Sequence, residues 1–244
     1  MQNYFYFYFQ MSLILNIETS TEVCSVSISE KGKCKYLKIF GHNSETNDNK
    51  GNHSKLLAVF INEILTENSI LPKQLDAVAI SSGPGSYTGL RIGVSTCKGF
   101  CVGINLPLIS VNTLQIMANM AVNIYKNDID LYVPMIDAKR MEVYTTIFDK
   151  KLNFLSDVEA KIVDENSYSN VKNKKIGFFG NGMNKCKSIF SNDNFSFLPD
   201  IFPSAEYMDS LSEKLFLEKK FTDLVYFEPF YLKEFVATTP KNKF

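Results

Sequence analysis

The feature that most constrains this fold is a glycine-rich stretch, Ser81-Ser82-Gly83-Pro84-Gly85-Ser86-Tyr87-Thr88-Gly89-Leu90-Arg91. The run before it, 75–80, is short and apolar, as expected of a buried strand, and apolar residues recur at helical spacing after it. The stretch is therefore predicted to turn the chain from a strand into a helix. Its glycines permit positive φ and close backbone approach, and Ser86 or Thr88 can cap the helix.

The same turn is a candidate anion site, because free amides and the positive end of a helix dipole attract negative charge. It has neither the GxxxxGK[ST] nor the GxGxxG spacing, so a tight turn in which glycine serves geometry alone remains open. A second candidate follows the predicted strand 13–17, where open α/β sheets bind ligands; an ordinary hairpin turn is the alternative. The candidate residues are Glu18, Thr19, Ser20, Gly83, Gly85, Ser86, Thr88, Gly89 and Arg91.

Composition bounds the protein class. The 244 residues suffice for two lobes, and 26 basic against 26 acidic residues leave no net charge to attract nucleic acid or a membrane. RNA contact would need a local patch or a partner. Five cysteines without a CxxC pair predict reduced thiols and a cytoplasmic protein. No apolar run is long enough to span a bilayer.

Element spacing predicts two lobes, 11–111 and 112–244, after an aromatic leader at 1–10 that matches no targeting signal. Translation is expected to start at Met11. The first lobe should hold three antiparallel strands (13–17, 23–29, 34–40), helices at 53–68 and 90–104, and strands at 75–80 and 106–111. The second should hold a helix at 113–125, a hairpin at 131–148, a strand at 176–180, helices after 181 and at 204–217, and an extended tail at 229–232.

The two helices of the first lobe carry more apolar or small surface than one packed face needs. The helix at 53–68 extends its apolar arc beyond its core stripe, and the next carries a row of small residues opposite its own. We expect an association surface there, although packing within the chain explains the row equally well. The candidate interface residues are His53, Leu56, Phe60, Ile92, Thr96, Gly99 and Gly103.

Familiar catalytic patterns are missing from the sequence. Its two histidines, His42 and His53, are too far apart for a helical metal pair, and there is no GxSxG elbow. Charges gather in the predicted turn of the later hairpin, at Asp137, Lys139, Arg140 and Glu142; solvated turn charges are favoured there over a binding site. No metal site or catalytic residue is predicted.

Several motifs in order resemble the TsaB family, the dimerisation subunits of the bacterial complex that makes threonylcarbamoyladenosine in tRNA. They are Ile14-Leu15-Asn16-Ile17-Glu18-Thr19-Ser20, His53-Ser54-Lys55-Leu56-Leu57, Gly83 to Gly93, Ser110-Val111-Asn112-Thr113-Leu114, Asp137-Ala138-Lys139-Arg140-Met141-Glu142-Val143-Tyr144 and Glu228-Pro229-Phe230-Tyr231-Leu232. The resemblance implies an α/β fold of the two-lobed actin-like ATPase class (ASKHA, ribonuclease H-like), with mixed sheets flanked by helices.

The resemblance also implies a non-catalytic scaffold. It would pair through the two helices with a metal-bearing catalytic paralogue, TsaD, and a TsaE ATPase would join the pair. Contact with tRNA would come only through the complex, a homodimer is possible, and no cofactor is firmly implied, although ATP or ADP could lie at the complex interface. Lys55 departs from the acidic residue usual in the family. The alternative is a nucleotide-using enzyme or a glycoprotease-like peptidase acting by itself.

Overall fold

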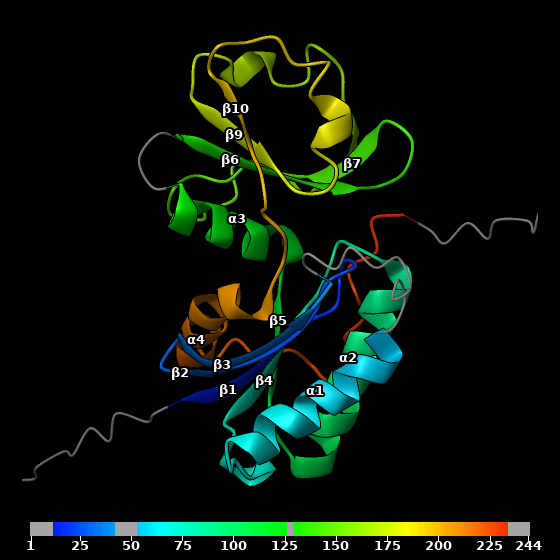
Figure 1. Ribbon diagram of the computed structural model, residues 1–244, viewed down its shortest axis with the longest axis vertical. Coiled ribbons are helices and arrows are strands. Elements are labelled where there is room, and N and C mark those ends of the chain that lie inside the picture. Colours follow the sequence, from blue (N-terminus) through cyan, green and yellow to red (C-terminus); the bar gives the residue numbers. More distant parts are fainter. Residues whose placement is uncertain (1–11, 42–52, 126–128, 234–244) are drawn as a thin grey trace, which may run out of the picture.

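The computed structural model describes residues 12–41, 53–125 and 129–233, which form two lobes joined through a helix (Figure 1). The predictions of a leader at 1–10 and of a start at Met11 lie outside the described residues, as does His42. Within the described ranges, no helix is both long and apolar enough to cross a membrane.

The first lobe is built on a five-stranded mixed sheet, ordered β3-β2-β1-β4-β5. Its strands are β1 (Leu13–Glu18), β2 (Cys24–Glu30), β3 (Lys33–Phe40), β4 (Ala77–Ser81) and β5 (Leu108–Val111). The first three pair antiparallel, as predicted, whereas β4 and β5 run parallel to β1. Alternation along β1 places Leu15 and Ile17 in the core on one face and Ile14 in the core on the other.

Helices cover both faces of this sheet. Helices α1 (His53–Glu67) and α2 (Tyr87–Ile104) lie side by side on one face, and α4 (Asp209–Leu217) packs against the other (Figure 1). Of the two residues predicted as possible caps of α2, Ser86 is the cap: its hydroxyl accepts from the Gly89 amide. Asn112 likewise caps α3 (Thr113–Ile124) by accepting from Leu114.

The second lobe repeats the strand pattern of the first. Its strands are β6 (Leu131–Asp137), β7 (Glu142–Thr145), β8 (Glu159–Ile162), β9 (Ile176–Phe179) and β10 (Phe195–Leu198). They are ordered β10-β9-β6-β7-β8, with β6, β7 and β8 antiparallel and β9 and β10 parallel to β6. Counted from each lobe's first strand, both sheets therefore read 3-2-1-4-5.

Two predicted helices differ in the structure. The segment after Asn181 forms only a short 3₁₀ turn, η4 (Asn184–Cys186), because Met183, Cys186 and Ile189 follow a three-residue spacing and the amides bond three residues back. The prediction of a helix reaching Phe190 is therefore wrong. The helix expected at 204–217 is divided into η5 (Ala205–Tyr207) and α4.

The chain returns to the first lobe after the second. Helix α4 covers the first sheet, Thr222 bridges Leu108 of β5, and the amide of Phe230 donates to Ser82 O at 2.7 Å. A lobe boundary at 111/112 stays a prediction, but the segment from α4 to Lys233 is built largely onto the first lobe.

Candidate functional site: the glycine turn, the paired helices and the cleft

The glycine turn packs directly on the turn between β1 and β2. A Cβ atom would lie 2.3 Å from Ser20 O at Gly85 and 2.1 Å from Thr19 O at Gly89. The amide of Ser86 donates to Ser20 O at 2.6 Å, and the hydroxyl of Thr19 donates to Gly89 O at 2.8 Å. Only glycine allows this approach, so these two positions serve the contact between the turns.

Three backbone amides of the turn already have partners. The amide of Gly83 donates to the Thr113 hydroxyl at 3.2 Å, that of Ser86 to Ser20 O, and that of Gly89 to the Ser86 hydroxyl. Arg91 is exposed, with its guanidinium 5.4 Å from the ring centroid of Tyr87. These bonds favour the structural interpretation of the turn; an anion bound there, with Thr88 and Arg91 on its exposed side, stays a prediction.

Glu18 lies beneath this turn without exposed surface. Its Oε1 accepts from the Ser20 amide at 2.5 Å. Burial raises the pKa of the Glu18 carboxyl from 4.5 to about 7, and hydrogen bonds from Ser20 oppose the rise only in part. A carboxyl with such a pKa is a candidate acid or base, but Glu18 is closed off from any substrate.

The predicted interface residues divide into two groups. Leu56, Phe60 and Ile92 pack against the core between the first sheet and its helices α1 and α2. The buried His53 ring lies 3.3 Å from Val23 O, and the Thr96 hydroxyl donates to Ile92 O of its own helix. In contrast, Gly99 and Gly103 are exposed, and a Cβ atom at either would meet nothing within 4 Å. The open surface is therefore centred on the small residues of α2.

Apolar side chains stand exposed on the same two helices. Val59 of α1 is 46% exposed and Val102 of α2 is 71% exposed. Val102 was missing from the predicted set, although its position three residues after Gly99 could have placed it on the same side of α2. Whether this surface binds a partner is not tested by the fold, and the interface remains a prediction.

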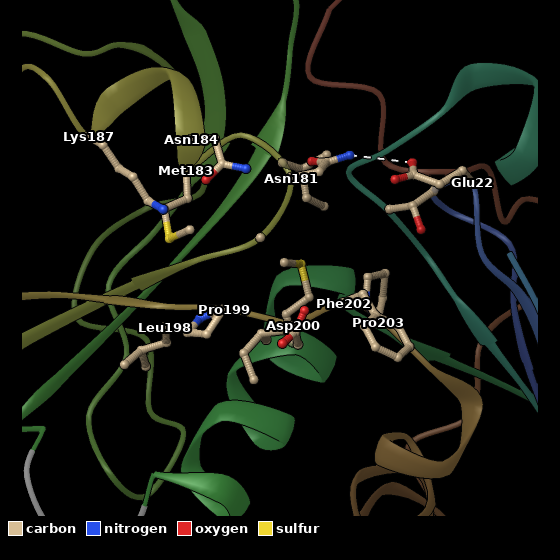
Figure 2. Close-up of a pocket in the computed structure, with 15 residues that line it drawn as sticks. Glu22, Asn181, Met183, Asn184, Lys187, Leu198, Pro199, Asp200, Phe202 and Pro203 are labelled. Carbon is tan, nitrogen blue, oxygen red and sulfur yellow. Dashed lines mark hydrogen bonds between the residues drawn. The ribbon is translucent and has the colours of Figure 1, made fainter. Parts of the chain in front are cut away.

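A cavity of about 340 Å³ lies between the lobes (Figure 2). Asn181 follows β9, and its side-chain Nδ2 donates to Glu22 Oε2 across the cavity at 3.4 Å. Its Oδ1 accepts from the backbone amide of Asp137. None of the predicted anion-site residues lines this cavity. Its walls come from Thr21, Glu22, Met117, Ile136, Gly180, Asn181, Met183, Asn184, Lys187, Leu198, Pro199, Asp200, Ile201, Phe202 and Pro203.

The charged turn between β6 and β7 is held within the chain. Lys185 pairs with Asp137 and donates to Arg140 O at 2.8 Å, while Lys233 pairs with Glu142. Lys139 and Arg140 adopt positive φ angles of 71° and 50°. In the parts of the chain that the structure describes, no group of three His, Cys, Asp or Glu side chains could hold a metal ion.

Two lobes with one repeated strand order, each a mixed sheet flanked by helices or turns, define the actin-like ATPase class of folds, with ribonuclease H-like lobes. The family model of TsaD, tRNA N6-adenosine threonylcarbamoyltransferase, matches residues 46–215. The chain is also similar over nearly its whole length to proteins described as tRNA threonylcarbamoyladenosine biosynthesis protein TsaB. It belongs to the TsaB family.

Individual relatives support this assignment. The TsaB protein of Buchnera aphidicola subsp. Baizongia pistaciae is 30% identical, over 91% of this chain and 98% of its own. That of Haemophilus influenzae is 27% identical, over 92% and 94%. The solved structure of YeaZ from Pseudomonas aeruginosa has a TM-score of 0.77 at 21% identity, covers 91% of this chain and 100% of its own, and supports the fold.

Proposed function

We propose that this chain is the scaffold subunit of the complex that forms threonylcarbamoyladenosine next to the anticodon of tRNA. It would pair through α1 and α2 with a TsaD-like catalytic subunit. Membership of the TsaB family supports a role in the formation of threonylcarbamoyladenosine. The observation that carries the docking is the open α2 surface, where Gly99 and Gly103 leave room for another helix backbone to approach.

Buried titratable side chains of the first lobe favour a scaffold over a stand-alone enzyme. Glu18 is sealed beneath the turn, and burial raises the pKa of the Cys24 thiol to about 12 and that of Cys101 to about 11. Thiols with such pKa values are not nucleophilic thiolates near neutral pH. A nucleotide-using enzyme or peptidase remains the second hypothesis, with the interlobe cavity as the place where a substrate could bind.

The remaining partners are part of the proposal. A TsaE-like ATPase joins the pair, tRNA is contacted only through the assembled complex, and ATP or ADP lies at the interface between subunits rather than on the closed glycine turn. The site of action is the cytoplasm. When the catalytic subunit is scarce, the same surface pairs two copies of this chain.

Reconstitution of tRNA modification with TsaD and TsaE, with and without this chain, tests the scaffold role. Activity should require the chain, while the chain alone should turn over little ATP. If the isolated chain hydrolyses substrate and Arg91→Ala, at an exposed residue, abolishes that activity, the enzyme hypothesis wins.

Substitutions on α2 test the docking surface. Gly99→Leu should block pairing with TsaD in a pull-down while the monomer stays folded, because a Leu side chain fills the open space beside the helix. Lys214→Leu adds the same side chain to an exposed position of α4 and should leave pairing unchanged. Phe60→Asp is a weaker test, because Phe60 also packs against the core. Unimpaired pairing of the Gly99 variant would refute this surface.

A further inference from the structure

A buried group of unpaired oxygens closes the carboxyl end of β1. Oε2 of Glu18 and the hydroxyls of Ser20 and Ser81 are all buried, and none has a hydrogen-bond partner of good geometry among the described residues. Both hydroxyls nevertheless lie close enough to the carboxyl to influence its pKa. Ser20 lies in the turn after β1, and Ser81 is the last residue of β4, where the glycine-rich stretch begins.

No cation compensates the carboxyl in the described part of the chain, where Glu18 forms no salt bridge. The titratable group facing it from β2 is Cys24, whose pKa of about 12 keeps the thiol neutral. His53 of α1 lies against Val23 O, and Arg91 of α2 is exposed beside Tyr87.

Protonation of Glu18 removes the free-energy cost of burying this carboxyl as an anion. An ionised carboxylate without a cation is costly to bury, whereas the neutral acid carries no charge. Protonation also turns Oε2 into a donor, and a hydroxyl oxygen such as that of Ser20 or Ser81 can accept from it. The same hydroxyls can donate to the ionised carboxylate and lower its pKa, but burial raises the pKa by more.

A chain of hydrogen bonds connects this carboxyl to the start of α2. Glu18 Oε1 accepts from the Ser20 amide, and Ser20 O accepts from the amide of Ser86 at 2.6 Å. Ser86 is the N-cap residue whose hydroxyl holds the Gly89 amide. The position of Ser20 therefore ties the state of Glu18 to the first turn of α2.

We propose that a proton on Glu18 latches the glycine turn onto the turn between β1 and β2, and that loss of this proton loosens the first turn of α2. The latch is strongest below about pH 4.5. It weakens as the pH rises from the ordinary carboxyl pKa of 4.5 toward about 7, because the closed state holds the proton more tightly than the open one. Above that pH the effect levels off. This device concerns how α2 is held and does not depend on what α2 binds.

Hydrogen exchange of the amides of Ser20, Ser86 and Gly89 between pH 5 and 8 tests the latch. After correction for intrinsic exchange, their protection should fall with rising pH, by at most about tenfold per unit, and level off above pH 7. Glu18→Gln resembles the neutral acid in shape and should keep the protection of pH 5 at every pH. Glu22→Gln alters an exposed carboxyl of the same turn and should behave as the unaltered chain.

Protection that does not change with pH in the unaltered chain, or a pH-dependent loss that persists in Glu18→Gln, would overturn the latch. If Glu18→Gln does not fold, the carboxyl ¹³C resonance of Glu18 in the unaltered chain decides. A midpoint near 7 supports the proposal, and a midpoint near 4.5 refutes it.

Discussion

The same substitution at two glycines of α2 should have opposite effects on stability. At Gly89 an added Cβ atom would lie 2.1 Å from Thr19 O, a backbone atom that moves only if the whole turn moves. At Gly99 it would meet nothing within 4 Å. Gly89→Ala and Gly99→Ala therefore differ in their surroundings and not in the chemical change.

The expected magnitudes follow from these contacts. Alanine in a helix gains about 0.5–1 kcal/mol over glycine, so Gly99→Ala should raise the free energy of unfolding by about that amount. At Gly89 the same gain is outweighed by overpacking, which typically costs about 1–3 kcal/mol and more where backbone must shift. Because the gain is common to both variants, they should differ by the overpacking cost, about 1–3 kcal/mol. Gly93→Ala should be intermediate, because its contacts are the side chains of Thr19 and Ile80.

Urea unfolding followed by circular dichroism measures these differences as shifts in the transition midpoint at unchanged slope. If Gly89→Ala were as stable as the unaltered chain, the close approach of the two turns would not require glycine, and our account of the turn would be wrong. A Gly99→Ala variant destabilised by more than about 1 kcal/mol would equally contradict an open surface at that position.

Three further outcomes are expected. Asp209 is buried and accepts hydrogen bonds from Asn16 and Ser27, and burial raises the pKa of its carboxyl to about 7. In the folded protein this carboxyl therefore keeps a proton that it has lost in the unfolded chain, and the free energy of unfolding should fall by about 2–4 kcal/mol as the pH rises from 4 to 7. Asp209→Asn should reduce that slope in urea titrations. Phe178→Ala should cost about 3–5 kcal/mol in the same assay, because Phe178 is fully buried among four aromatic rings; a loss below 1 kcal/mol would contradict this packing. Ser86→Ala should cost about 1 kcal/mol through the lost cap, and exchange of the Gly89 amide should rise with it.

Much of the fold was predictable because its signals are local. Alternation along β1 and β2, the turn between β2 and β3, and the capping residues Ser86 and Asn112 depend on residues within a few positions of each other. The same reasoning failed after Asn181, where a three-residue spacing of apolar side chains gives a 3₁₀ turn in place of the predicted helix. A short apolar pattern does not by itself distinguish a 3₁₀ helix from an α-helix.

The candidate site was only partly predictable. The sequence predicted Glu18 and Ser20 in one candidate turn and Gly85 and Gly89 in another. It did not predict that the two turns contact each other, or that the amides of Ser86 and Gly89 are already bonded. Which residues of α2 stay open also depended on the packing of α1 beside it. The cavity between the lobes could not be predicted from the sequence, because Glu22 and Asn181 come together only after both lobes have folded.

The order of strands and helices in the first lobe, the strand-to-helix turn and the cap of α2 were thus determined by the amino-acid sequence itself, through hydrogen bonds and periodicities between near neighbours. The tertiary structure alone decided the burial of Glu18 and Asp209, the return of α4 to the first sheet and the exposure of Gly99. Burial and pKa depend on which distant segments exclude water from a side chain, and no local pattern records that.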